Sequence, residues 1–301
     1  MSSVPPPAVC VSCLTVYRRD HCELSERSCR LANRGDSARA IQRLEEAEDQ
    51  EPGLASYYQF YRTIYLLQDA AKTGITETLE LMEEEILEAR AAQGLPQLAF
   101  SQLPLEPVRF QVLASDLAEA LVRYRAEESG EDDMMVPANT DWVSLAEERF
   151  APEGDERGEP GVVELATDLA LTPYLEWASE QIAPHLKEIR WGKGNCPVCG
   201  GDPNFAYLEK EAGERWLVCS RCRAEWKYRR LTCPFCGNED HTKLRYYPAG
   251  NSNEYRLYVC DVCHRYLKAL DLRKVEGEAV LSVEPVLTWS LDVAAREKGY
   301  R

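Results

Sequence analysis

Four Cys-x-x-Cys pairs between residues 196 and 263 constrain this chain more than any other feature. Each pair forms a tight turn that places two thiolates on one side of a loop, and two facing turns make a tetrahedral four-sulfur cage. The pairs combine into C-x2-C-x19-C-x2-C and C-x2-C-x23-C-x2-C. The predicted metal ligands are therefore eight cysteines in two sets: Cys196, Cys199, Cys219 and Cys222, then Cys233, Cys236, Cys260 and Cys263.

This region is an internal repeat. The string CPVCG at residues 196–200 corresponds to CPFCG at residues 233–237, and WLVCSRC at 216–222 corresponds to LYVCDVC at 257–263. Alternating apolar residues around two turns, Glu209–Gly213 and Gly250–Asn253, predict one β-hairpin in each repeat. A unit of about 40 residues is too small for an adequate apolar core, whereas a structural Zn²⁺ contributes about 10–16 kcal/mol. We therefore expect neither ribbon to fold without its metal.

The ligand set restricts the chemistry but not the metal. Tetrahedral thiolate sites accept iron as well as zinc, and the CPxCG turn is the type seen in rubredoxins, so a redox-active iron protein is one alternative. A catalytic zinc keeps an open position and usually has His ligands. Because all predicted ligands are Cys, we expect closed sites and no enzyme activity. We expect His264 to be a hydrogen-bond donor near the metal or a surface residue, and His241 to be a loop residue.

The remaining sequence predicts an α+β protein, with an all-α N-terminal domain followed by tandem rubredoxin-like or zinc-ribbon β modules. Apolar residues recur at helical spacing up to Arg190, and strand-like alternation begins at Trp191. Within the helical region the pattern predicts a helix from Thr76 to Gly94, a break at Pro173 and another at Pro184. The predicted parts are a flexible extension (1–35), a helical domain (36–190), two ribbons (191–232 and 233–275) and a C-terminal strand or helix tail (276–301).

The charge pattern bears on the partners. The chain carries a formal net charge of −16, which opposes binding to phosphate backbones. Residues 190–274 nevertheless hold 16 Lys and Arg against 10 Asp and Glu, with one cluster near Trp226 and Tyr228: Arg221, Arg223, Lys227, Arg229 and Arg230. This cluster suits a nucleic-acid surface or an acidic protein surface, including the chain's own helical part. The overall charge favours the protein surface.

The N-terminal segment contains a less regular cysteine set. Cys10, Cys13, Cys22 and Cys29 form C-x2-C-x8-C-x6-C, which lacks a second Cys-x-x-Cys pair. A third metal site is one interpretation, but the segment follows a proline run and has few apolar residues, so we interpret it as a flexible extension. The chain shows no secretory signal and no apolar run long enough for a membrane helix, which favours the cytoplasm, where thiols stay reduced.

The tandem knuckles resemble the FdhE family, the formate dehydrogenase accessory proteins. The matching strings are CPVCGG (196–201), WLVCSRC (216–222) with Glu225-Trp226, CPFCG (233–237), YVCDVC (258–263) and YLK (266–268). Outside the ribbons, SYYQFY (56–61) and AREKGY (295–300) are also similar, so the resemblance covers about residues 36–301.

The resemblance implies a cytoplasmic helper that binds the catalytic subunit of formate dehydrogenase, a molybdenum or tungsten pterin enzyme with an iron-sulfur cluster. It also implies that the eight ribbon cysteines hold two metal ions, and it implies no catalytic reaction. The resemblance does not extend to the four N-terminal cysteines and assigns them no role. Neither the residues nor the resemblance decides whether the protein forms a homodimer or whether it acts before or after cofactor insertion.

Overall fold

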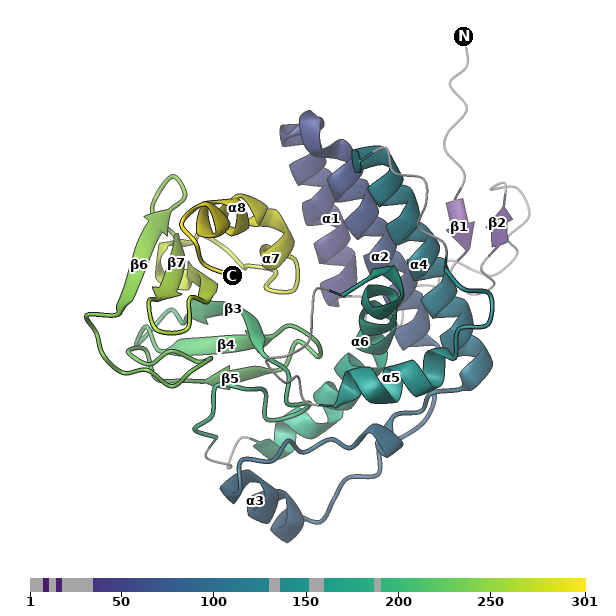
Figure 1. The fold of residues 1–301 in the computed structure, drawn as a ribbon, viewed down its shortest axis with the longest axis horizontal. Coiled ribbons are helices and arrows are strands. Elements are labelled where there is room, and N and C mark those ends of the chain that lie inside the picture. Colours follow the sequence, from purple (N-terminus) through teal and green to yellow (C-terminus); the bar gives the residue numbers. More distant parts are fainter. Residues whose placement is uncertain (1–7, 11–14, 18–34, 130–135, 152–159, 187–190) are drawn as a thin grey trace.

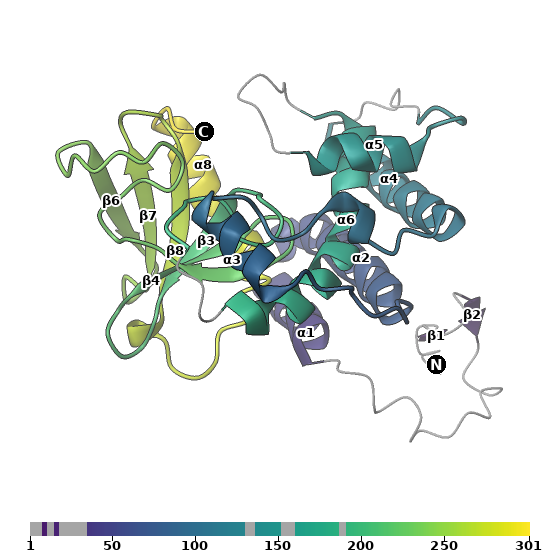
Figure 2. The same ribbon diagram turned by 90° about the horizontal axis from the view of Figure 1, so that it is seen from below.

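The structure is a computed structural model that describes residues 8–10, 15–17, 35–129, 136–151, 160–186 and 191–301. A helical part and a sheet part lie side by side, and the C-terminal helices lie against the sheet on its helical side (Figure 1). Viewed from below, the sheet and α8 lie on one side of the molecule, and α2, α4, α5 and α6 lie on the other (Figure 2). The predicted α+β class is confirmed. No described helix is long and apolar enough to span a bilayer.

The helical part follows the apolar periodicity of the sequence. Its helices are α1 (Gly35–Gln50), α2 (Ala55–Thr73), α3 (Glu84–Ala92), α4 (Pro107–Ser129), α5 (Trp142–Phe150) and α6 (Val162–Ile182), with 3-10 turns at Pro52–Leu54, Phe100–Gln102 and Ala183–Leu186. The α5 helix is capped at its N-terminus, where the Asp141 carboxylate accepts a hydrogen bond from the Ser144 amide. Before this part, β1 (Ala8–Cys10) and β2 (Thr15–Tyr17) pair antiparallel; Cys13, Cys22 and Cys29 lie outside the described residues.

The helix expected from Thr76 to Gly94 is wrong in its first half, because α3 begins only at Glu84. The preceding segment is held in place by tertiary contacts. The Leu79 amide donates to the Gln181 side chain of α6 at 3.0 Å, and Leu79 itself is buried. Local periodicity cannot detect such a contact, since its partner lies about one hundred residues away in the chain.

The break expected at Pro173 is also wrong, since α6 continues through this proline. A proline inside a helix cannot donate to the carbonyl four residues earlier, which here is that of Leu169. The side-chain amide of Gln68, on α2, donates to this carbonyl at 2.8 Å. The neighbouring helix therefore satisfies the acceptor that the proline leaves free, and α6 ends only at Ile182, just before Pro184.

The sheet part is one mixed sheet with the order β5-β4-β3-β8-β7-β6. Its strands are β3 (Pro203–Leu208), β4 (Arg215–Cys219), β5 (Glu225–Lys227), β6 (Leu244–Ala249), β7 (Tyr255–Cys260) and β8 (Tyr266–Asp271). Both expected hairpins are present, as β3–β4 and β6–β7. The edge strand β6 contains Pro248, which is tolerated only where no further strand needs the missing amide.

The two ribbons are joined by a parallel pairing of β3 with β8, from Phe205 opposite Lys268 to Leu208 opposite Asp271. The strand order places β8, β7 and β6 beyond β3 in the same sense as β5, β4 and β3. The repeats are therefore related by a translation along the sheet. The sequence repeat predicts two ribbons, but not that they share one sheet.

The C-terminal segment connects the two parts. It contains a 3-10 turn (Leu272–Lys274), α7 (Glu284–Leu287) and α8 (Trp289–Glu297). From α2, the Tyr57 hydroxyl donates to the Val286 carbonyl and the Tyr65 hydroxyl donates to the Ser282 carbonyl, at 3.1 and 2.6 Å. On the sheet side, the buried Lys268 ammonium contacts Asp292 of α8 at 2.7 Å. Tyr57 and Tyr65 of α2 therefore hold the C-terminal segment against the helical part.

Candidate metal centres

The first cysteine cluster is fully buried. Its members are Cys196 and Cys199 in the turn before β3, and Cys219 and Cys222 after β4. The Sγ atoms of Cys196 and Cys222 are 3.5 Å apart, as are those of Cys199 and Cys219. All four sulfurs lie within 4.8 Å of one another, so the hairpin brings the two knuckles face to face.

The second cluster repeats this arrangement at the far end of the sheet. Cys233 and Cys236 precede β6, and Cys260 and Cys263 follow β7. The Sγ distances are 3.7 Å for Cys233–Cys263 and 3.7 Å for Cys236–Cys260. The structure therefore brings together all eight residues that the sequence singles out, in the two predicted sets.

Both clusters fit a tetrahedral metal ion. A disulfide would place two sulfurs about 2.05 Å apart, and none of the eight described cysteines forms one. Zinc-thiolate bonds of about 2.3 Å in a tetrahedron place neighbouring sulfurs about 3.8 Å apart, close to the 3.5 and 3.7 Å in the two clusters. Two four-cysteine sites able to hold a metal ion are thus present, and this geometry suits zinc and iron equally.

The knuckle backbones are shaped to surround an ion. Gly200 and Gly237 close the first knuckle of each repeat with φ of 79° and 71°, as expected for a reversing turn. The second knuckles close with Arg223 and His264, at φ of 55° and 54°. Neither residue type predicts a positive φ, and the only sequence signal is that both residues directly follow the last cysteine of their repeat.

Backbone amides also point at the sulfurs. In the first cluster, the Val198 amide donates to Cys196 at 3.3 Å and the Arg221 amide donates to Cys219 at 3.4 Å. Such bonds steady the negative charge of metal-bound thiolates. Burial raises the pKa of the Cys196 thiol and that of the Cys222 thiol well above the usual value, so four buried thiolates need a cation beside them.

The two clusters differ in their exposure because the helical part covers only the first. The segment after α3 lies along the first knuckle, where the Gln97 and Leu98 amides donate to the Pro197 and Val198 carbonyls at 2.9 and 3.0 Å. In the second cluster, by contrast, Cys236 is exposed and Cys263 is half-buried. The first site is an internal part of the fold, and the second lies at the surface.

Four of the five residues in the basic cluster near Trp226 interact with other groups of the same chain. Arg221 donates to the Arg149 and Phe150 carbonyls of the helical part, and Arg223 pairs with Glu176 of α6 at 2.9 Å. Lys227 and Arg229 pair with Glu214 and Glu239 of the sheet part. This arrangement agrees with the protein-docking interpretation, with the chain's own helical part as one of the docked surfaces.

Comparisons with known proteins agree with this geometry. The family model for the central domain of FdhE matches residues 195–230, which hold the first cluster. An FdhE homologue from Aquifex aeolicus is 26% identical over 268 residues, covering 87% of this chain and 91% of the homologue. One from Shewanella oneidensis is 33% identical over 107 residues, which is 35% of each chain. The crystal structure of the FdhE protein from Pseudomonas aeruginosa shares the fold, with a TM-score of 0.62 at 22% identity, covering 90% of this chain and 94% of that one.

The fold and the site define a class of protein in which a helical part is fused to one sheet that carries two closed four-cysteine clusters. The chain is similar to FdhE proteins along most of its length, and its first ribbon matches the model of their central domain. The expected resemblance is confirmed along most of the chain, and most specifically at the first ribbon.

Proposed function

We propose that this protein is an accessory protein for the assembly or activation of formate dehydrogenase, and that it binds the catalytic subunit of that enzyme in the cytoplasm. The observation that carries the proposal is the pair of closed four-cysteine clusters on a single sheet, in a chain similar to FdhE proteins. Sites with four thiolate ligands leave no open position for a substrate. Their use is to hold loops rigidly for recognition, which is the requirement of a helper rather than of an enzyme.

In this proposal the eight ribbon cysteines hold two metal ions, one in each set of four, and the metal supplies a cross-link between the two knuckles of a hairpin. The protein residues do the rest. The amides of Val198 and Arg221 orient the thiolates, and Arg223 holds the first ribbon against α6 through Glu176. The helical part and the sheet then present one continuous surface to the client.

The test is capture of the catalytic subunit by tagged full-length protein, together with formate oxidation in a strain that lacks the gene. Replacing Cys236 and Cys260 with Ser should abolish capture, and Ser220→Ala serves as the control because Ser220 is an exposed knuckle residue that is not one of the eight. Normal formate oxidation in the deletion strain would refute the proposal.

Neither alternative function is favoured by a particular contact. Nucleic-acid binding would use the basic cluster, but Arg221 and Arg223 are engaged by the helical part. Metal analysis after anaerobic purification distinguishes zinc from iron. Two zinc ions per chain with no visible absorption would remove the redox alternative and leave the accessory function in place.

A further inference from the structure

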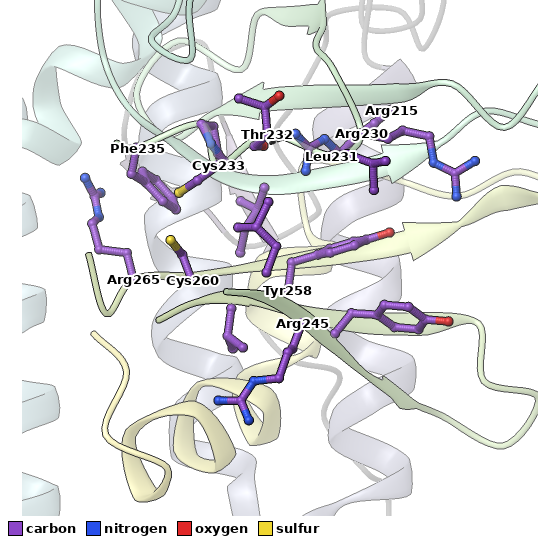
Figure 3. Close-up of a pocket in the computed structure, with 15 residues that line it drawn as sticks. Arg215, Arg230, Leu231, Thr232, Cys233, Phe235, Arg245, Tyr258, Cys260 and Arg265 are labelled. Carbon is purple, nitrogen blue, oxygen red and sulfur yellow. Dashed lines mark hydrogen bonds between the residues drawn. The ribbon is translucent and has the colours of Figure 1, made fainter. Parts of the chain in front are cut away.

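A small hollow opens beside the second cluster, between its first knuckle and the strands β6, β7 and β8. Its volume is about 80 Å³. Apolar side chains and arginines line it, with none of the described lining residues being Asp or Glu: the arginines are Arg215, Arg230, Arg245 and Arg265. Figure 3 shows Arg230 and Leu231 on one wall and Tyr258 and Arg245 on the other, with Cys233 and Cys260 at one end.

Two of these arginines are neutralised within the chain and two are not. Arg245 pairs with Asp261 and Arg265 pairs with Asp202, both at 2.7 Å. For Arg215 and Arg230, no carboxylate in the described part of the chain lies within ion-pair distance. In a protein with a formal net charge of −16, two such guanidinium groups at one hollow are a local excess of positive charge.

Arg215 is the more unusual of the two, because it is only 3% exposed. Its Nη2 donates to the Thr232 carbonyl at 2.6 Å and to the Arg229 carbonyl, but its Nε finds no acceptor among the described atoms. The rings of Tyr228 and Tyr258 lie 5.4 and 5.9 Å from its guanidinium carbon. These rings compensate a buried cation only in part, and burial lowers the Arg215 pKa to about 10, so the group remains charged at neutral pH. Thiolates around the neighbouring metal would balance some of this charge, but they supply no acceptor to Nε.

The mouth of the hollow is apolar and exposed. Leu231, in the turn that links the ribbons, is 72% exposed, and Tyr246 of β6 is 53% exposed. Large apolar side chains gathered at a concave site, next to unpaired charge, are typical of protein interaction surfaces. The hollow has room for about one side chain, and the arginines beside it would meet a carboxylate next to that side chain.

We infer that this hollow binds an acidic segment of a partner protein, with one apolar side chain inserted between Leu231 and Tyr246 and a neighbouring carboxylate bound by Arg230 and Arg215. The inference deepens the proposed function, on which it rests for the identity of the partner as a client, but the chemistry of the segment follows from the hollow alone. A nucleic acid suits the site less well. Its phosphates would lie against an apolar mouth, whereas aliphatic and carboxylate side chains match both surfaces.

The probe is a short acetylated peptide in which leucine and glutamate alternate. The control ligand is the same peptide with glutamine in place of glutamate. Fluorescence anisotropy with the metal-loaded full chain should show binding that is at least about tenfold tighter for the glutamate peptide, as expected for hydrogen bonds between charged groups. Equal affinity for the two peptides, or binding of neither, would overturn the inference. Displacement of the glutamate peptide by a single-stranded oligonucleotide would do the same, because it would assign the surface to nucleic acid.

Variants localise the site without disturbing the core. Leu231→Asp and Arg230→Glu change exposed side chains, and each should weaken binding of the glutamate peptide by about tenfold or more. The control is Val108→Asp, which places the same charge at a 67% exposed position on α4. Arg215→Lys keeps the positive charge but removes the planar guanidinium group. It should therefore weaken binding of the glutamate peptide less than Arg230→Glu does. Unchanged affinity in both surface variants would place binding elsewhere.

The same variants separate this inference from the proposed function. If Leu231→Asp loses the peptide but still captures the catalytic subunit, the accessory function stands and the hollow is not the client site. If the variant binds the peptide normally and the subunit is captured, the hollow is excluded and the function again stands. If no form of the protein captures the subunit although the peptide binds, the proposed function fails and the acidic-segment site remains.

Discussion

The side-chain amide of Gln68 replaces a backbone donor that α6 lacks. Pro173 leaves the Leu169 carbonyl without its intrahelical partner, and Gln68, buried at the α2–α6 contact, donates to it. This single bond explains why a proline that should end a helix is tolerated in the middle of one. It also makes a residue on one helix responsible for the continuity of another.

Replacing Gln68 with Ala should lower the free energy of unfolding by about 1–3 kcal/mol, since a partly buried carbonyl would lose the donor that replaces its backbone partner. Urea denaturation of the metal-loaded protein measures the effect. Gln59→Ala is the control, because Gln59 is exposed and its side chain donates to Glu48 at the surface. In a Pro173→Ala background the Leu169 carbonyl regains a backbone donor, so the loss on removing Gln68 should shrink. An equal loss in both backgrounds would contradict the explanation.

Glu284 is a second residue whose role depends on its surroundings. It is 3% exposed, and burial raises its pKa above the usual range, although the hydrogen bond from Tyr255 and the charge of Arg43 oppose the shift. The ionised carboxylate is therefore disfavoured in the folded state at neutral pH. As the pH falls through the raised folded-state pKa towards the ordinary value near 4.5, the folded protein takes up a proton before the unfolded chain does, and this penalty disappears.

Glu284→Gln should accordingly raise the melting temperature at pH 7 and have little effect in the acidic range, because the amide still accepts from Tyr255. Melting curves at a series of pH values check this. Glu278→Gln, at an 85% exposed side chain, should change neither curve. A gain that is the same at every pH would show that the carboxylate charge is not the cause.

At the scale of elements, the knuckle turns were predictable and their surroundings were not. The CPxCG strings mark both ribbons because ligand spacing and glycine position are local properties of the chain. The parallel pairing of β3 with β8, the amide contacts of Gln97 and Leu98 with the first knuckle, and the extended path before α3 all depend on partners far away in sequence. No local pattern encodes them, and so the sequence predicts two separate ribbons where the structure has one sheet.

Gly200 and Gly237 share a positive φ but differ in the atoms around them, so their alanine variants separate backbone strain from a tertiary clash. Alanine at Gly200 or at Gly237 would be held at positive φ, at a cost of about 1–2 kcal/mol. A Cβ at Gly200 would also lie 2.8 Å from Cγ of Pro96, whereas one at Gly237 meets nothing within 4 Å. Gly200→Ala should therefore lower the melting temperature of the metal-loaded protein more than Gly237→Ala. Equal shifts would mean that Pro96 moves away at no cost.

At the scale of the whole molecule, the core runs without interruption from the helices into the first ribbon. One buried cluster includes Leu98, Leu117 and Leu175 of the helical part together with Cys196 and Trp226 of the sheet part. The first metal site therefore supports more than its own hairpin. Leu267 and Ala269 of β8 also belong to this cluster, but the cysteines of the second site do not. Loss of the second metal should therefore affect the helical part less than loss of the first.

Hydrogen exchange after metal removal should show this dependence. Chelation should expose the amides of Gln97 and Leu98, because their acceptors belong to the first knuckle. The middle of α2 packs against α1, α4 and α6 and should keep its protection. Mass spectrometry of peptides from the two regions measures both in one experiment. Retained protection at residues 97–98 in the metal-free protein would show that the knuckle keeps its shape without an ion.

The translation that relates the ribbons has an evolutionary consequence. When two units are related by a two-fold axis, both contribute the same edge strand to the joint, so a third unit cannot be added in the same way. Here the first strand of one unit meets the last strand of the next, which leaves β5 and β6 as unlike, open ends. A further duplication could add a third unit beyond β5 without rebuilding the existing joint, whereas Pro248 in β6 opposes addition at the other end.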